Sequence, residues 1–207
     1  MAQYFSVHPE NPQPRLLRQA VALLQAGQVL AVPTDSSYAL VCQLDDKAAA
    51  DQLRTIRGLD EKQLLSLICR DLSELASYAR VDNAQYRLLK LGTPGPFTFI
   101  LEASKEVPRR VSHPQRKTIG LRVPDHRALL ELIELHGALL APTLTLPDET
   151  EPLNDPDEIR DRLARLIGGV IEAGPCPSQG STVIDLSGDA PEVLRRGLGD
   201  PALLGLA

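Results

Sequence analysis

The sequence predicts an α/β protein built on one sheet, and three observations support this class. The length of 207 residues favours one large domain over two small ones. Short apolar runs, such as residues 28–32 before Pro33, have the length and boundaries of buried strands. Apolar residues at helical spacing lie between these runs, and helices and strands intermix along the whole chain.

The first half of the chain begins with a short expected strand at residues 4–7. A helix follows Asn11 and Pro12, with an apolar face that includes Leu17 and Leu24, and Gly27 ends it. A polar turn at residues 33–37 separates two expected strands. The remaining elements expected here are strands at 28–32, 37–44 and 64–69, a helix at 46–56, and a helix beginning at Asp71.

The second half contains one helix with a clear start. Asp155 can cap it, Pro156 suits its first position, and Glu158 can complete a capping box. Glu158 with Arg162 and Asp161 with Arg165 have the spacing of helical ion pairs. The other elements expected here are strands at 97–101, 118–123, 138–143, 169–173, 182–186 and 192–195, and a helix at 125–135.

Composition excludes several classes of protein. The chain has 22 Lys and Arg against 27 Asp and Glu, a formal net charge of −5, and its 43% hydrophobic content is that of a globular protein. No apolar stretch approaches the ~18 residues of a membrane span. The start of the chain lacks a basic region followed by an apolar core, so we expect a cytoplasmic protein without an export signal.

Metal and nucleophile chemistry find little support in the residues. Cys42, Cys69 and Cys176 lie far apart without CxxC spacing, so buried reduced thiols are expected and a structural metal is not. The P-loop, GxGxxG, GxSxG and HExxH motifs are all missing. The histidines show no ligand spacing and are expected on loops or at the surface: His8, His113, His126 and His136.

Polar segments follow several expected strands, and ligands bind at strand ends in open α/β sheets. These segments combine hydroxyl groups with arginine, as in Thr34, Arg57, Arg122, Thr143 and Arg195. A guanidinium fork matches a carboxylate or a phosphate, so the pattern favours a small anionic ligand such as a nucleotide or an amino acid. The alternative is that the hydroxyls satisfy backbone groups and the arginines lie on a solvated rim.

Charge is segregated along the chain. Nine basic and three acidic residues between Arg87 and Arg127 give this segment +6, which leaves −11 on the remainder. A basic face of this kind can attract a phosphate backbone although the whole chain is acidic. The alternative is two unrelated solvated surfaces.

Five motifs in order resemble the YrdC/YciO family: residues 33–38 (PTDSSY), 94–98 (PGPFT), 122–126 (RVPDH), 181–186 (STVIDL) and 194–197 (LRRG). The match covers about residues 20–199, within one domain of residues 1–207. Residues 4–12, 69–75 and 105–110 resemble the YciO branch in particular. The resemblance implies a twisted mixed parallel and antiparallel sheet flanked by helices, with a basic concave cavity. This fold is related to that of dihydroxybutanone phosphate synthase.

The resemblance also implies an activity. Family members make L-threonylcarbamoyladenylate and pyrophosphate from ATP, L-threonine and bicarbonate, and the product serves threonylcarbamoyladenosine modification of tRNA. Carried over by position, Thr34, Arg122 and Ser181 would bind threonine. Arg57, Thr118, Ala141, Thr143 and Arg195 would bind ATP, and Mg²⁺ is expected with the nucleotide. No residue is expected to act as a covalent catalyst.

The sequence departs from the family pattern at two positions of the nucleotide site. Thr55 stands where active synthases carry a lysine, and Thr145 where they carry an asparagine. Each lost donor is worth roughly 10²–10³ in rate at such a site, so a weakened synthase is one hypothesis. A second is a homologue that binds double-stranded RNA or tRNA without robust synthase activity, through Arg109, Arg110, Arg116 and Lys117. A third is a protein with another acyl or nucleotide ligand.

Overall fold

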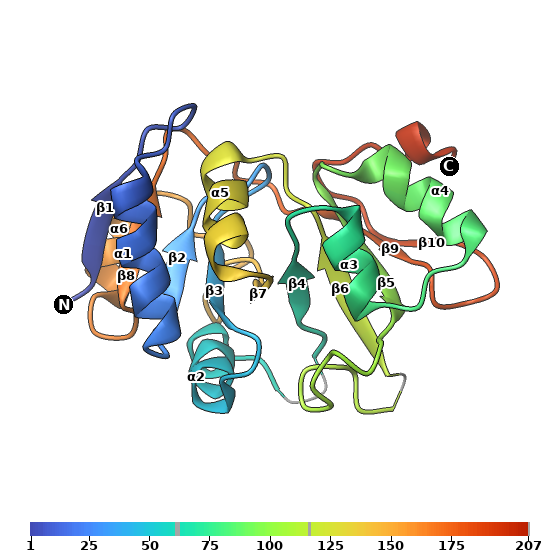
Figure 1. Ribbon diagram of the computed structural model, residues 1–207, viewed down its shortest axis with the longest axis horizontal. Coiled ribbons are helices and arrows are strands. Elements are labelled where there is room, and N and C mark those ends of the chain that lie inside the picture. Colours follow the sequence, from blue (N-terminus) through green and yellow to red (C-terminus); the bar gives the residue numbers. More distant parts are fainter. Residues whose placement is uncertain (61–62, 116, 207) are drawn as a thin grey trace.

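The computed structural model describes residues 1–60, 63–115 and 117–206. It confirms the predicted fold class, a mixed sheet flanked by helices (Figure 1). The sheet has 10 strands in the order β1-β8-β2-β3-β7-β4-β6-β5-β9-β10. Parallel neighbours are β1 with β8, β2 with β8, β4 with β6 and β5 with β9, and the other neighbouring pairs are antiparallel.

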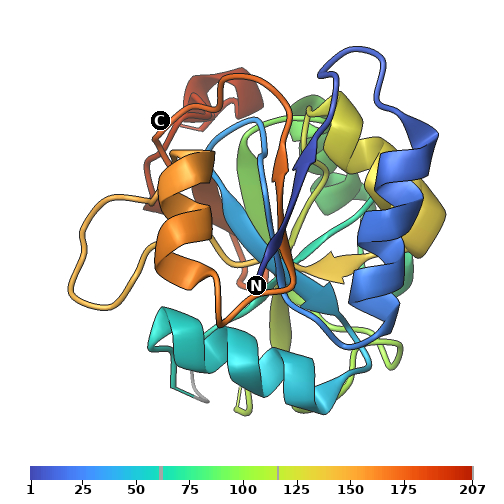
Figure 2. The ribbon, with the colours of Figure 1, turned by 90° about the vertical axis from the view of Figure 1, so that its left-hand side faces the viewer.

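One half of the sheet is covered on both faces. Figure 2 shows α1 and α5 on one side of these strands and α6 on the other. Apolar residues of α1 and α5 pack on one face because both helices present their apolar positions to it. The elements of this half are β1 (Gln3–Ser6), α1 (Pro14–Gln25), β2 (Leu30–Val32), β3 (Ala39–Gln43), α5 (Arg127–His136), β7 (Leu139–Leu140), α6 (Pro156–Leu163) and β8 (Gly169–Glu172).

The remaining elements belong mostly to the other half, although α2 packs against β3. A second core cluster spans both halves, since it includes Ala31 of β2 and Val170 of β8, and its buried aromatic members are Tyr38, Phe97 and Phe99. Its members are otherwise mostly Leu, Val, Ile and Ala, as a chain with few aromatic residues requires. The elements are α2 (Lys47–Arg57), β4 (Ser66–Ile68), α3 (Leu72–Tyr78), α4 (Asn83–Gly92), β5 (Phe97–Glu102), β6 (Thr118–Arg122), β9 (Thr182–Asp185), β10 (Glu192–Arg195) and the 3₁₀ helix η1 (Pro201–Leu204).

Two elements were missing from the sequence prediction, α4 and η1. The signal for α4 was present, because the Asp82 side chain accepts from the Gln85 N–H and the Gln85 side chain accepts from the Asp82 N–H. This reciprocal capping box is a helix-start signature that can be read from sequence. Since η1 has four residues, it offers no periodic pattern to detect.

Several predicted boundaries were wrong by a few residues. The predicted strand at 138–143 reduces to β7; Pro142 has no N–H to donate, and the chain beyond β7 keeps an isolated bridge between Thr143 and Ala39. The predicted strand at 37–44 begins only at Ala39. The helix after Pro12 begins at Pro14, and α5 is capped by His126 instead of starting at residue 125.

The start of α6 is confirmed in part. Asp155 accepts from the N–H groups of Asp157 and Glu158, and Pro156 occupies the first turn. The Glu158 side chain forms the predicted ion pair with Arg162, at 3.2 Å. Asp161 was predicted to pair with Arg165, but in the structure it forms an ion pair with Arg160, at 3.4 Å.

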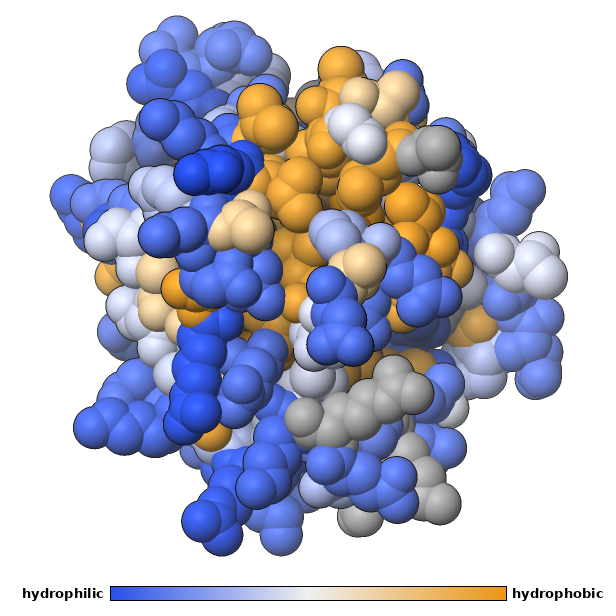
Figure 3. Space-filling model, turned by 90° about the vertical axis from the view of Figure 1, so that its right-hand side faces the viewer, coloured by the Kyte–Doolittle hydropathy of each residue, from blue (hydrophilic) through white to orange (hydrophobic). Residues whose placement is uncertain are grey.

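One end of the molecule, where α4, β10 and η1 lie, exposes apolar residues. Figure 3 shows hydrophobic residues gathered on this face. Leu91, Leu194 and Leu203 are among the exposed leucines of these three elements. Within the described residues, no helix has the length and apolar character needed to span a membrane.

Candidate functional site

The loop that joins β2 to β3 is built around the buried hydroxyl of Thr34. Its Oγ1 accepts from the N–H groups of Ser36 and Ser37, at 3.0 and 3.2 Å, and donates to the Ser37 carbonyl, at 2.7 Å. Cys176 Sγ donates to the Thr34 carbonyl at 3.3 Å. A short hydroxyl residue that bonds its own backbone favours a tight turn, and this turn places Asp35 and Ser36 opposite the end of β6.

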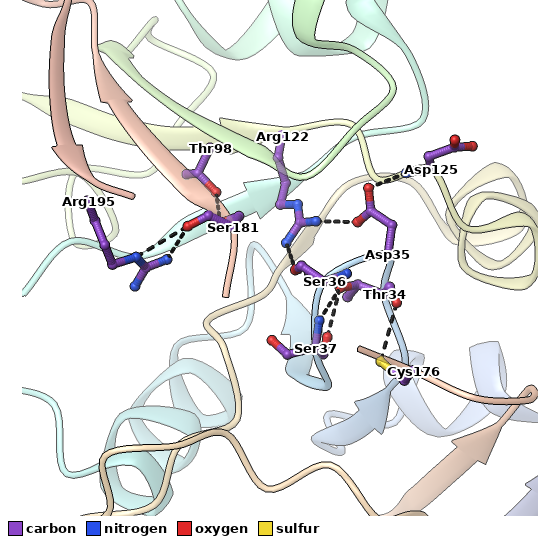
Figure 4. A network of polar contacts seen from close by, with 10 residues as sticks. All are labelled: Thr34, Asp35, Ser36, Ser37, Thr98, Arg122, Asp125, Cys176, Ser181 and Arg195. Atoms are coloured by element: carbon purple, nitrogen blue, oxygen red, sulfur yellow. Dashed lines mark hydrogen bonds and ion pairs between the residues drawn. The ribbon is translucent and has the colours of Figure 1, made fainter. Parts of the chain in front are cut away.

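Arg122, the last residue of β6, meets this loop inside the protein. Its Nη1 donates to Ser36 Oγ at 3.1 Å, and its Nη2 pairs with Asp35 Oδ1. Asp35 Oδ2 accepts from the Asp125 N–H at 2.9 Å, so both carboxylate oxygens are engaged (Figure 4). Burial lowers the pKa of the Arg122 guanidinium, and the Asp35 charge opposes this shift. Its Nε is buried and has no hydrogen-bond partner.

A second group of polar residues comes from the neighbouring strands. Because β5 and β9 are parallel with Thr98 opposite Val183, Thr98 lies beside Ser181, and their hydroxyl oxygens are 2.7 Å apart. Arg195 of β10 donates from Nε and Nη2 to the Ser181 carbonyl, at 3.2 and 2.9 Å (Figure 4). Burial lowers the pKa of Arg195.

Arg57, the last residue of α2, is the third arginine of the site. Its Nε is buried without a hydrogen-bond partner, and burial lowers its pKa. Gly58 follows in a left-handed conformation, φ 62°, and ends the helix at that position. An unsatisfied buried N–H of a cation is costly in the empty protein, and an anionic ligand would satisfy it.

The three arginines share one cavity of about 260 Å³. Among the residues that the structure describes, its wall contains no carboxylate, histidine or cysteine side chain. Six residues predicted for substrate binding line it: Arg57, Arg122, Ala141, Thr143, Ser181 and Arg195. The other residues of the wall are Leu59, Leu64, Ser66, Thr98, Ile100, Pro142 and Val183.

Two predicted substrate residues lie off this wall. Thr34 is 1% exposed and supports the loop that contacts Arg122 instead of facing the cavity. Thr118 is buried at the start of β6, four residues before Arg122. At ~3.3 Å per residue, that spacing puts the two about 13 Å apart.

Sequence reasoning did not select Ser66 or Thr98 as site residues, although the cavity includes both. Thr98 stood in a polar strand-end segment, so a signal existed. Ser66 is a single hydroxyl at the start of a short strand, and only pairing with β6 brings it to the cavity.

At the two positions where the sequence departs from the family pattern, the threonine forms a hydrogen bond to a backbone carbonyl. Thr55 is exposed on α2 and its Oγ1 donates to the Asp51 carbonyl at 2.9 Å, so its hydroxyl bonds its own helix. The Thr145 N–H donates to the Thr143 carbonyl at 3.0 Å. Neither residue lines the cavity.

The basic segment does not form one surface. Arg122 is inside the cavity wall, and Arg127 pairs with Glu131 at 3.1 Å. Arg109, Arg110 and Lys117 are exposed, and the predicted RNA-binding residue Arg116 lies outside the described residues. Arg109 and Arg110 line a separate cavity of about 870 Å³, to which Lys47 and Arg54 of α2 also contribute.

Cys42 and Cys69 are buried, as predicted, whereas Cys176 is half-buried. Burial raises the pKa of Cys42 to about 12 and that of Cys176 to about 11, and Cys69 shifts in the same direction. In the part of the chain that the structure describes, no group of three or more His, Cys, Asp or Glu side chains could hold a metal ion.

The fold and this cavity define an α/β protein with a cationic, hydroxyl-lined cavity beside the strands of its sheet. Residues 22–197 match the Sua5/YciO/YrdC family, described as "Telomere recombination". The chain therefore belongs to that family. The uncharacterized protein YciO of Escherichia coli is 46% identical over 97% of this chain and 98% of its own length. The crystal structure of E. coli YciO has a TM-score of 0.95 and covers 99% of this chain and 100% of that one.

More distant relatives have names that state an activity. Human threonylcarbamoyl-AMP synthase is 35% identical over 83% of this chain, which spans 63% of the human protein. The structure of P. abyssi Sua5 complexed with L-threonine has a TM-score of 0.86 and 26% identity, and covers 94% of this chain and 57% of that one.

Proposed function

We propose that the protein is a threonylcarbamoyl-AMP synthase-like enzyme. It would convert ATP, L-threonine and bicarbonate to threonylcarbamoyladenylate, pyrophosphate and water, for tRNA modification in the cytoplasm; the water carries away the oxygen that bicarbonate loses when its carbon bonds to the threonine amine. One observation carries the proposal. Three arginines converge on a cavity whose described wall residues include no carboxylate, and two of these arginines have a buried Nε without a hydrogen-bond partner among the described residues. The similarity to a synthase and to a Sua5 structure complexed with L-threonine supports the same reaction.

Each cavity residue has a part that suits its environment. Arg57 and Arg195 would bind the triphosphate, since each faces the cavity without a carboxylate partner among the described residues. Arg122 would bind the threonine carboxylate, and Ser181 and Thr98 would offer hydroxyl groups beside it. Thr34 would act indirectly, because its turn positions the loop that contacts Arg122. Ala141 and Thr143 would pack near the nucleotide. Thr118 would support the strand that positions Arg122.

The reaction is a displacement at phosphorus. An oxygen of the threonine carbamate forms a bond to the α-phosphorus of ATP, and the bond from that phosphorus to the bridging oxygen of pyrophosphate breaks. Negative charge gathers on the α-phosphate oxygens and on the leaving group. Fixed guanidinium groups stabilise this charge without reorganising, and no protein nucleophile is needed.

The residues present do not fit an Mg²⁺ ion held by the protein. Protein-bound Mg²⁺ takes carboxylate oxygens, and the cavity wall has none within residues 1–60, 63–115 and 117–206. The neighbouring carboxylate, Asp35, is engaged by Arg122 and the Asp125 N–H. We therefore assign no step to a metal.

Thr55 and Thr145 make the proposed enzyme a weakened one. Neither residue lines the cavity, so neither replaces the donor that active family members carry at its position. The three arginines remain, and the proposed rate is accordingly low and not zero.

The test is pyrophosphate release by the purified protein. Release is expected only when ATP, L-threonine and bicarbonate are all present, and Arg195→Gln should lower it by roughly 10²-fold. Arg196→Gln is the matched control, because Arg196 is adjacent to Arg195 and also exposed, but does not line the cavity. Release that needs fewer than three substrates, or that survives Arg195→Gln, would contradict the proposal.

A second candidate function is binding of double-stranded RNA or tRNA. The observation in its favour is the group of exposed basic residues around the 870 Å³ cavity, Arg109 and Arg110 with Lys47. RNA affinity would then fall steeply with salt, and the double variant Arg109→Ala, Arg110→Ala would weaken it. Arg15→Ala with Arg18→Ala removes the same charge from α1 and serves as the control. Affinity that is insensitive to salt would contradict RNA binding.

A further inference from the structure

The three arginines of the cavity differ in how their charges are balanced. In the described part of the chain, Arg57 and Arg195 form no ion pair, whereas Arg122 is paired with Asp35. The Arg122 and Asp35 side chains are 7% and 9% exposed, so solvent screens this pair little. The cavity therefore has two uncompensated cations and one cation that already has an anionic partner.

Asp35 is held in place from both sides. Its Oδ1 accepts from Arg122 and its Oδ2 accepts from the Asp125 N–H at 2.9 Å. The turn formed by Thr34 fixes the backbone on which Asp35 lies. Asp35 does not line the cavity, so it acts on a ligand through Arg122.

This arrangement has a consequence for ligand charge. A carboxylate that reaches the free N–H groups of Arg122 also approaches the Asp35 carboxylate, and two like charges in a buried site repel. A ligand that brings an ammonium group with its carboxylate adds no net charge to the pair. A site that holds a repulsive group against the wrong ligand discriminates as strongly as one with extra attractive contacts.

We propose that Asp35 is a positioning residue that makes the Arg122 subsite selective for a zwitterionic α-amino acid over a simple carboxylate. The inference rests on the proposed function, because that function puts an amino acid at Arg122. The inference adds that the negative charge of Asp35 determines whether a zwitterion or a simple anion binds at Arg122. Arg57 and Arg195, which have no such partner, remain for the phosphates.

The test compares three ligands by calorimetry in the presence of α,β-methylene-ATP, which occupies the phosphate subsite without reacting. L-threonine is a zwitterion, (R)-3-hydroxybutyrate is its anionic analogue without the amino group, and L-threoninamide is a cation. The wild-type protein should bind L-threonine at least about tenfold more tightly than either analogue, as expected for one unfavourable charge. In Asp35→Asn, the preference over (R)-3-hydroxybutyrate should fall to about threefold or less.

Asp189→Asn is the control, since Asp189 is an exposed carboxylate and its loss changes the net charge equally. Affinity for α,β-methylene-ATP should be unchanged in both variants, which a general loss of structure would not allow. An unchanged preference in Asp35→Asn overturns the proposal. So does a wild-type protein that binds either analogue as well as L-threonine, a result that needs no variant to fold.

Pyrophosphate release separates this inference from the proposed function. A protein that discriminates as described but releases no pyrophosphate supports the selectivity and contradicts the reaction. A protein that releases pyrophosphate and keeps its preference in Asp35→Asn supports the reaction and overturns the selectivity. Absence of any amino-acid binding overturns both.

Discussion

Replacing Arg57 by methionine should stabilise the empty protein and weaken nucleotide binding. Arg57 holds a buried Nε without a hydrogen-bond partner, and its charge has no carboxylate partner in the described chain. A methionine side chain has similar length and no donor to leave unsatisfied. The residue is therefore a place where binding and stability oppose each other.

The magnitude follows from two opposing effects. An unsatisfied buried donor costs about 1–3 kcal/mol, and the half-buried position of Arg57 favours the lower end of that range. A cation in the last turn of α2 contributes about 0.3–1 kcal/mol through the helix dipole, which the variant loses. The net gain is about 0.5 kcal/mol, or a rise in Tm of about 1–2 °C for a chain of this size.

The ligand side changes in the opposite direction. Hydrogen bonds from a charged group contribute about 1.5–3 kcal/mol, so ATP should bind about 10- to 100-fold more weakly to Arg57→Met. Calorimetric unfolding of the empty protein and titration with α,β-methylene-ATP measure the two effects separately.

Arg54→Met is the matched control on the same helix. The Arg54 guanidinium donates to the carbonyls of Asp60 and Gln63, at 2.7 and 3.2 Å, and does not line the 260 Å³ cavity. Its loss should lower Tm by about 6–24 °C, because two bonds from a charged donor disappear, each contributing about 1.5–3 kcal/mol. An Arg57→Met protein that is as destabilised as Arg54→Met, or that keeps its ATP affinity, would refute the reasoning.

Three further predictions concern the scaffold. A Cβ at Gly120 would lie 2.8 Å from Ser66 Oγ, so Gly120→Ala should cost about 1–3 kcal/mol in urea unfolding, and adding Ser66→Ala should recover part of it; no recovery would disprove the clash. Burial lowers the pKa of His126, so the unfolded chain takes up the proton first and stability should fall as pH drops below about 6.5; His126→Asn keeps a capping side chain and should flatten that slope, and an unchanged slope would contradict this. Tyr38→Phe removes the hydroxyl that donates to the Ile171 carbonyl at 3.0 Å and should cost about 1–2 kcal/mol, whereas a neutral result would show that this buried carbonyl is satisfied otherwise.

Much of the fold could be predicted from local patterns. The apolar face of α1 and the cap of α6 by Asp155 both depend on residues within one or two turns of each other. The predicted strand at 138–143 was too long because apolar content alone does not say which N–H groups find a partner. The two residues of β7 pair regularly with β3 and β4, and beyond them the contacts are single: the Leu40 N–H donates to the Pro142 carbonyl, and Thr143 forms an isolated bridge with Ala39.

The candidate site was predicted less evenly. Resemblance to the family selected Arg57, Arg122 and Arg195, which do line one cavity. It also selected Thr34, which does not line the cavity. The Thr34 hydroxyl instead forms hydrogen bonds with the backbone of its own turn. Ser66 was missed because nothing in its neighbouring residues marks a hydroxyl that reaches a cavity through strand pairing.

The sequence by itself determined the α/β class, the caps and the family, because these depend on residue types at short or fixed spacing along the chain. Only the tertiary structure decided how charge is distributed. The basic segment between Arg87 and Arg127 suggested one face, yet the fold buries Arg122 beside Asp35, 87 positions away, and leaves Arg109 at a different cavity. Whether a guanidinium is solvated, paired or unpartnered depends on which distant strands and loops meet around it. Which strands and loops meet there is determined by the packing of the sheet. The three arginines of the cavity therefore differ in their ion pairs and hydrogen bonds.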